Sequence, residues 1–127
     1  MLVGVSRALR SPEPPARIVA LEPATSPVLT TGIPGTHRVE GMGAGFVPPL
    51  LTREDYDEAR AIDEQEARAM ARRLAREEGI FVGISSGLNV VAALQLAQEL
   101  GAGHTVATVA VDTGLKYLAG DLFESLG

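Results

Sequence analysis

The stretch that decides the fold is Gly79-Ile-Phe-Val-Gly-Ile-Ser-Ser-Gly-Leu-Asn-Val-Val-Ala-Ala-Leu-Gln-Leu-Ala97. It opens with a short apolar run, Ile80–Val82, which is typical of a buried strand in a parallel sheet. A serine-containing turn framed by Gly83 and Gly87 follows at once. Polar residues are few from Leu88 to Leu100, so we expect a helix that is largely buried. The stretch therefore predicts a strand, a turn and a helix in direct succession.

The two serines of this turn, Ser85 and Ser86, allow two interpretations. Either serine can cap the first turn of the helix, and a helix cap alone would account for both residues. The serine that does not cap the helix is free to face a ligand. A helix start also offers unpaired N–H groups and the positive end of the helix dipole to an electron-rich group.

Outward from this stretch, further strands and helices alternate along the chain. The other predicted strands are Arg17–Glu22, Glu58–Ile62 and Thr105–Val111. This order predicts an α/β fold, a partial three-layer sandwich of a parallel sheet with helices on its faces. Ligands bind such sheets beyond the carboxyl ends of the strands, where Ser85–Ser86 and Asp112–Thr113 both belong.

Two further helices are expected, at Leu2–Arg10 and from Asp63 to Gly79. No capping residue precedes Leu2, whereas Asp63 is a good N-cap and Glu66 completes a capping box. The predicted buried stripe of the second helix consists of Ala67, Met70, Ala71 and Leu74. Its arginines, Arg68, Arg72, Arg73 and Arg76, are interpreted as a solvated face, with Glu64 and Arg68 paired on the exposed side.

Composition limits the classes of function. The chain has 127 residues, which fits one domain, and 46% of them are hydrophobic. Its net charge of −5 and its single lysine, Lys116, argue against nucleic acid as a partner. The absence of cysteine excludes disulfides and thiolate chemistry. No apolar run is long enough to span a membrane and the N-terminus does not resemble a signal peptide, so a cytoplasmic protein is expected.

A long segment rich in glycine, proline, threonine and serine, Pro23–Pro49, connects the first two strands. At its centre, in Glu40-Gly-Met-Gly-Ala-Gly-Phe46, glycine occupies every second position. Such spacing lets a backbone pass very close to another group, which favours a binding loop. A tight connection without further function would also use glycine in this way.

The sequence fits a serine hydrolase or a metal-binding protein less well. Gly83-Ile-Ser-Ser-Gly87 matches the G-x-S-x-G pattern of serine hydrolases, in which Ser85 would be the nucleophile. That fold needs an acid followed by a histidine downstream, but neither His37 nor His104 follows Asp112. The same two histidines are isolated, so no metal site is predicted.

Four motifs together resemble the C-terminal part of cysteine synthase (O-acetylserine sulfhydrylase) and its relatives. They are Ala20–Val28 (ALEPATSPV), Val39–Pro48 (VEGMGAGFVP), Ala69–Gly79 (AMARRLAREEG) and Gly83–Gly87 (GISSG), in matching order and spacing. These relatives are the fold-type-II pyridoxal-phosphate enzymes, which include cystathionine β-synthase. The resemblance covers nearly the whole chain.

The resemblance implies roles for individual residues. Ser85 is similar to the family's cofactor-binding serine, whose hydroxyl meets the pyridine nitrogen of pyridoxal 5'-phosphate. Such a neutral partner leaves the ring nitrogen unprotonated, which suits β-elimination and β-replacement. Gly41, Met42 and Gly43 resemble the loop that borders the substrate and closes over it. No catalytic residue is assigned within the chain.

The family's Schiff-base lysine, asparagine loop and phosphate-binding loop all precede the matched region, and Lys116 occupies a late position. We therefore expect residues 1–127 to be a single α/β unit, the C-terminal part of a larger enzyme that is inactive alone. The resemblance implies that the complete enzyme is a homodimer that makes cysteine from an activated serine, such as O-acetylserine, and sulfide. The alternative is a non-catalytic interaction module that pairs with another chain through an exposed apolar edge.

Overall fold

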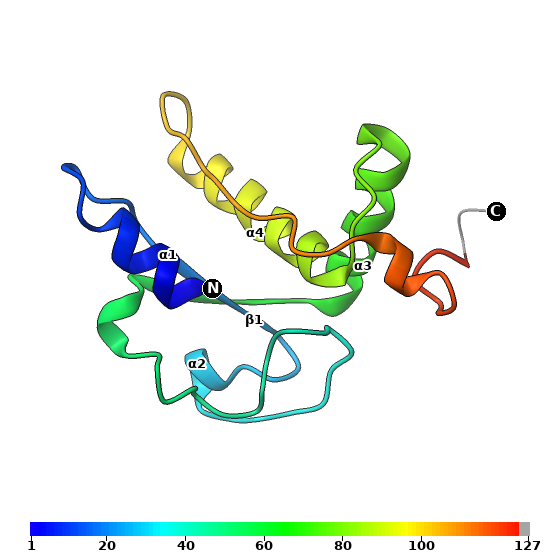
Figure 1. Ribbon diagram of the computed structural model, residues 1–127, viewed down its shortest axis with the longest axis horizontal. Coiled ribbons are helices and arrows are strands. Elements are labelled where there is room, and N and C mark those ends of the chain that lie inside the picture. The colour runs from blue at the N-terminus through cyan, green and yellow to red at the C-terminus, as the bar shows by residue number, and fades with distance from the viewer. Residues whose placement is uncertain (125–127) are drawn as a thin grey trace.

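The computed structural model describes residues 1–124 and contains a V-shaped pair of helices next to a parallel strand pair (Figure 1). The helices are α1 (Leu2–Leu9), α2 (Val28–Thr31), α3 (Glu64–Arg73) and α4 (Ile84–Leu100). Short helical turns are η1 (Arg53–Asp55), η2 (Leu74–Glu78) and η3 (Gly114–Tyr117), and the strands are β1 (Val19–Pro23) and β2 (Glu58–Ile62). The predicted α/β class is confirmed.

The two strands are parallel along their whole length. Val19 lies opposite Glu58 and Pro23 lies opposite Ile62. Just before the strands, the carboxylate of Asp57 accepts a hydrogen bond from the backbone N–H of Ile18 at 2.6 Å. This contact joins the starts of β1 and β2 and helps to fix their register.

The core lies between α3 and α4, and its buried members are aliphatic. They are Val39, Ile62, Ala67, Ala71, Ile84, Leu88, Val91, Ala92 and Leu122. The two helices approach closely at Gly87, where a Cβ atom would lie 2.1 Å from the carbonyl oxygen of Ala67. Only glycine fits at this position, so the glycine that ends the serine turn also sets the helix packing.

Helix α3 begins where the sequence predicts. The side chain of Asp63 accepts hydrogen bonds from the backbone N–H groups of Gln65 and Glu66, at 2.8 and 3.0 Å. Among the hydrogen bonds of residues 1–124, none returns from the Glu66 side chain, so only half of the predicted capping box forms. The helix continues through the π-helical turn η2 and ends at Gly79, which has a φ of 68°.

Two predicted strands do not form in the described part of the chain. Residues 80–82 make only an isolated antiparallel bridge, between Val82 and Thr113. Residues 105–111 run back along α4 without pairing into a sheet (Figure 1). Val109 and Val111, expected to be buried, are 43% and 50% exposed, and Ile80 is 45% exposed. An apolar run becomes a buried strand only beside a neighbouring strand, and residues 1–124 place none there.

The burial of two helical segments also differs from the prediction. The first half of α4 is buried, but its second half is not, and Leu94 is 47% exposed. Arg68 was expected on a solvated face, yet it is only 7% exposed. Its guanidinium donates to the carboxylates of Glu64 at 3.1 Å and Asp121 at 2.9 Å, which compensates its burial.

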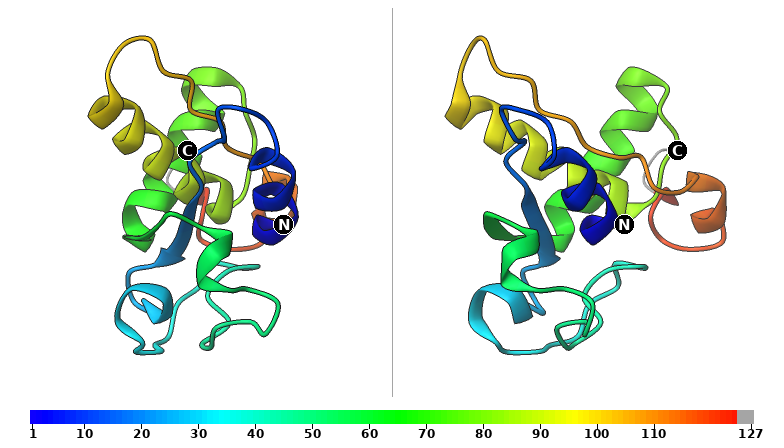
Figure 2. Two further views of the ribbon diagram at one scale, coloured as in Figure 1. Left: turned by 90° about the vertical axis from the view of Figure 1, so that its left-hand side faces the viewer. Right: turned by 60° about the vertical axis from the view of Figure 1, so that its left-hand side comes forward.

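Much of the segment between β1 and β2 forms a lobe beside the V of α3 and α4 (Figure 2), while Val39 and Met42 of this segment reach the core between the two helices. Within residues 1–124, no helix is long and apolar enough to cross a membrane. The same residues contain no group of three or more histidine, aspartate or glutamate side chains that could hold a metal ion.

Candidate functional site

The site is built around the first turn of α4, which carries Ser85 and Ser86. The N-cap of this helix is Gly83, and no side chain caps it, so the prediction of a serine cap is wrong. Both serines lie inside the helix and are buried. The N-cap lies two positions before Ser85 and three before Ser86, so both serines belong to the first helical turn and neither caps it.

The two hydroxyl groups differ in their partners. The Ser86 hydroxyl accepts a hydrogen bond from the backbone N–H of Val111 at 2.9 Å. No hydrogen bond within the described residues involves the Ser85 hydroxyl. The residue as a whole is only 5% exposed, but it lines a cavity and its oxygen is not a buried unsatisfied atom. An accessible hydroxyl without an internal partner is suited to bind a group that the chain itself does not supply.

Ser85 lines a cavity of about 310 Å³. The predicted loop residues Gly41 and Met42 line the same cavity, and Gly43 follows them directly. The remaining lining residues are Met1, Glu40, Asn89, Val111, Asp112 and Lys116. The structure therefore brings the predicted cofactor serine and the predicted substrate loop to one cavity, although more than 40 positions separate them in the sequence.

The glycine loop, residues 40–46, owes its shape to its three glycines. Gly41, Gly43 and Gly45 have φ values of 79°, 59° and 79°. These are left-handed conformations that side chains with a Cβ atom rarely adopt. The alternating glycines thus let the loop follow a tight path, and its Met42 packs against the hydrophobic core.

The acidic residue Asp112 also lines the cavity. Asp112 accepts a hydrogen bond from the Tyr117 hydroxyl at 2.8 Å. Burial of Tyr117, together with this bond, raises the pKa of its phenol, which therefore remains a donor. The other carboxylate oxygen of Asp112 is buried without a partner among residues 1–124.

Lys116 is a residue of this cavity that the sequence pattern did not assign. Its ammonium lies 3.3 Å from Asp112 and 3.8 Å from Glu40 of the glycine loop. Asn89 is a second such residue, and its amide donates to the carbonyl of Val109 at 2.9 Å. Their spacing in the sequence gives no signal, because the cavity forms only when residues 105–117 fold back along α4.

The hydrolase alternative finds no support in the geometry. His37 uses both ring nitrogens on backbone groups of its own loop, Val39 and Gly43. His104 is exposed in the turn after α4. Within residues 1–124, no histidine is therefore placed to activate Ser85 as a nucleophile.

Comparison with known proteins gives a consistent result. The family described as "Pyridoxal-phosphate dependent enzyme" matches residues 1–112. A cysteine synthase of Staphylococcus aureus (strain Mu50) is 48% identical over 122 residues, which are 96% of this chain and 39% of that protein.

Solved structures agree with the sequence relatives. O-acetylserine sulfhydrylase isoform 3 of Entamoeba histolytica superposes with a TM-score of 0.92 at 37% identity, covering 97% of this chain and 37% of that one. An O-acetylserine dependent cystathionine β-synthase of Helicobacter pylori gives a TM-score of 0.88 at 37% identity, covering 96% and 40%. The chain spans about two-fifths of the length of the relatives it matches. By sequence and by fold, it belongs to the pyridoxal-phosphate dependent enzymes of fold type II, the family that includes cysteine synthase.

Proposed function

We propose that this chain is the C-terminal part of a pyridoxal-phosphate dependent enzyme that makes cysteine from an activated serine, such as O-acetylserine, and sulfide. In this reaction the acetate group leaves the β-carbon and a carbon–sulfur bond forms in its place. The observation that carries the proposal is the unpartnered hydroxyl of Ser85 in a cavity bordered by the glycine loop. The similarity to cysteine synthase over 96% of the chain supports it.

The residues of the cavity fit one edge of the cofactor. The Ser85 hydroxyl, which is open to the cavity and has no partner within residues 1–124, would donate a hydrogen bond to the pyridine nitrogen. Pyridoxal phosphate, when bound, supplies the electron sink that β-replacement requires. Gly41 and Met42 would border the amino-acid substrate and exclude water from it.

The chain does not supply a lysine suited to anchor the cofactor. Lys116 is the only lysine in the sequence, and its ammonium contacts two carboxylates, Asp112 and Glu40. A lysine that bonds covalently to the cofactor must act as a free amine. We infer that the catalytic lysine and the phosphate-binding loop come from another polypeptide segment, and that residues 1–127 are inactive without it.

Exposed apolar side chains support the need for such a segment. Ile80, Val109, Val111 and Leu115 are all at least 43% exposed. The first three lie in extended segments whose backbone has few ladder partners among residues 1–124. Exposed extended segments with apolar side chains are surfaces on which additional strands pair. We propose that the remainder of the family fold covers them and that the complete enzyme is a cytoplasmic homodimer.

The test uses a chimera of S. aureus cysteine synthase in which this chain replaces the matched segment. With pyridoxal phosphate, O-acetylserine and sulfide supplied, the chimera is expected to form cysteine and the purified 127-residue chain is not. Cysteine formation by the chain alone would overturn the inference that a second segment is needed. A folded chimera that binds no cofactor would refute the proposed function.

The nucleophile is a separate question. The structural relative from H. pylori is described as an O-acetylserine dependent cystathionine β-synthase, whose name implies a thiol amino acid in place of sulfide. Supplying the chimera with homocysteine instead of sulfide distinguishes the two. We expect sulfide to be preferred, because the S. aureus relative at 48% identity is a cysteine synthase.

A further inference from the structure

The ring of His37 contacts the backbone of the glycine loop that borders the Ser85 cavity. Its Nε2 atom is 2.7 Å from the carbonyl oxygen of Gly43, and its Nδ1 atom is 3.2 Å from the backbone nitrogen of Val39. A Cβ atom on Gly43 would lie 2.4 Å from Nε2, so the loop backbone rests on the ring edge. One side chain thus connects the residue before the loop to its middle.

These two contacts assign hydrogen-bond roles to the ring nitrogens. A backbone N–H can only donate, so Nδ1 accepts the bond from Val39. A carbonyl oxygen can only accept, so Nε2–H donates a hydrogen bond to the carbonyl of Gly43. Both polar atoms of the ring are thus used by the loop and the residue before it.

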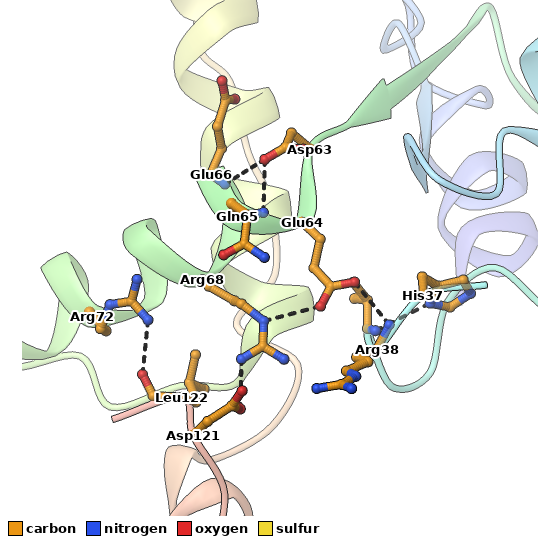
Figure 3. Close-up of polar contacts among 11 residues, drawn as sticks. His37, Arg38, Asp63, Glu64, Gln65, Glu66, Arg68, Arg72, Asp121 and Leu122 are labelled. Carbon is orange, nitrogen blue, oxygen red and sulfur yellow. Dashed lines mark hydrogen bonds and ion pairs between the residues drawn. The ribbon is translucent and has the colours of Figure 1, made fainter. Parts of the chain in front are cut away.

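The backbone next to His37, at Arg38 and Val39, is firmly held. Val39 is 2% exposed and belongs to the hydrophobic core. The N–H of Arg38 donates to Glu64, the first residue of α3, at 2.9 Å (Figure 3). Burial acts to raise the pKa of Glu64, but this bond and the Arg68 guanidinium outweigh it and hold the pKa below its usual value. The backbone beside His37 is therefore tied to the core and to α3.

The glycine loop has few polar contacts, although its Met42 packs against the hydrophobic core. Among residues 1–124, the only hydrogen bond and ion pair from side chains outside the loop to residues 40–46 are the His37–Gly43 bond and the 3.8 Å pair of Glu40 with Lys116. Both members of that pair are more than half exposed, and exposed ion pairs contribute little to stability. His37 is thus the main polar restraint on the position of the loop.

We propose that His37 is a positioning residue, which holds the glycine loop in the position where Gly41 and Met42 border the substrate. This inference rests on the proposed function for its effect on catalysis, but not for its effect on the loop. If the loop is already ordered before the substrate binds, less of the binding energy is lost in ordering it. Loss of the restraint should therefore weaken substrate binding more than it slows the chemical step.

The first test measures backbone amide exchange in the 127-residue chain. His37→Phe keeps a ring but removes both hydrogen bonds, and we expect exchange at Val39 to rise by about 10-fold, with faster exchange at Gly41–Gly45. His37→Asn retains an acceptor near Nδ1 and should protect Val39 alone. His37→Gln retains a donor near Nε2 and should preserve the loop better than His37→Phe. Exposed His104 provides the matched control, His104→Phe.

Exchange in α3 and the first half of α4 should remain at its wild-type level in every variant, which separates a loop effect from general unfolding. If His37→Phe fails to fold, the same comparison is made between the asparagine and glutamine variants, whose protection patterns should differ. The proposal is overturned if exchange at Val39 and Gly41–Gly45 in these variants matches that of His104→Phe.

The second test measures kinetics in the chimera. His37→Phe should raise KM for O-acetylserine by about 3- to 10-fold, the effect of losing the hydrogen bond to Gly43 of the loop, with a smaller change in kcat. His37→Gln should restore part of the loss. An unchanged KM in an active chimera would refute the role in catalysis. A chimera that binds no cofactor refutes the proposed function, while amide exchange still decides whether His37 holds the loop.

Discussion

Ser85 and Ser86 are neighbours in one helical turn, yet their hydroxyl groups have different surroundings. Ser86 accepts a hydrogen bond from Val111, whereas Ser85 faces a cavity without a partner among residues 1–124. The sequence Gly-Ile-Ser-Ser-Gly is compatible with either serine in either role. Which serine faces the cavity depends on where the helix begins, and Gly83 rather than a serine is its N-cap.

This difference predicts unequal effects of two alanine substitutions on stability. Ser86→Ala removes the acceptor for Val111 N–H and should lower the free energy of unfolding by about 1 kcal/mol. Ser85→Ala breaks no hydrogen bond within the described residues and should leave the free energy of unfolding nearly unchanged. Urea denaturation of the two variants measures both values. Equal destabilisation by the two substitutions would contradict the assigned roles.

At the scale of elements, the packing of α3 against α4 depends on Gly87. A Cβ atom there would lie 2.1 Å from the carbonyl oxygen of Ala67 and 2.9 Å from the nitrogen of Ala71. Gly87→Ala should therefore force the helices apart and cost about 1–3 kcal/mol of unfolding free energy. The loss should appear as a lower Tm in thermal denaturation.

Gly4, in α1, provides the matched control for this substitution. Nothing lies within 4 Å of a Cβ atom at Gly4, and alanine is favoured over glycine inside a helix. Gly4→Ala should be neutral or stabilising by up to about 1 kcal/mol. A Gly87→Ala variant as stable as Gly4→Ala would show that the two helices are less closely packed than described.

The sequence predicted correctly those features that neighbouring residues determine, and it failed for features that depend on distant residues. Strand β2 and the start of α3 were correctly predicted, because apolar pattern and the Asp63 cap are properties of neighbouring residues. Residues 105–111 were predicted to be a strand from the same kind of pattern, but a strand also needs a partner. The burial of Arg68 depends on its pairing with Asp121, which lies 53 positions away. No local sequence pattern predicts such a pair.

The candidate site follows the same rule. Ser85 and the glycine loop were found through motifs, and the structure places Ser85, Gly41 and Met42 at one cavity. Lys116 and Asn89 were missed, since they reach the cavity only through the return of the chain along α4. The role of Ser85 toward the cofactor and that of Gly41, Met42 and Gly43 toward the substrate remain proposals.

At the scale of the whole molecule, stability should fall at acid pH. The bond from Ile18 N–H, with a contribution from Arg10, holds the pKa of Asp57 below its usual value of 3.8. A carboxyl group whose pKa is lower in the folded state stabilises the protein above its unfolded pKa. That contribution is lost as the pH falls through the folded pKa. We expect the free energy of unfolding to decline below about pH 4.

Asp57→Asn tests this assignment. The wild-type chain should be more stable than the variant near neutral pH, and the difference should shrink as the pH is lowered from about 5 to 2. Urea denaturation across this range measures the difference. Glu13→Gln is the control, because Glu13 is exposed and forms no ion pair among residues 1–124. A constant difference between wild type and Asp57→Asn would contradict the account.

The central claim is that Ser85 is the partner of the cofactor ring in a complete enzyme. Its most direct test is the dissociation constant of pyridoxal phosphate for the chimera, measured by fluorescence titration for the parent chimera, Ser85→Ala and Ser86→Ala. We predict that Ser85→Ala weakens binding by about 3- to 10-fold, the effect of one hydrogen bond, and that Ser86→Ala matches the parent. Equal affinities for the parent and Ser85→Ala would contradict the claim.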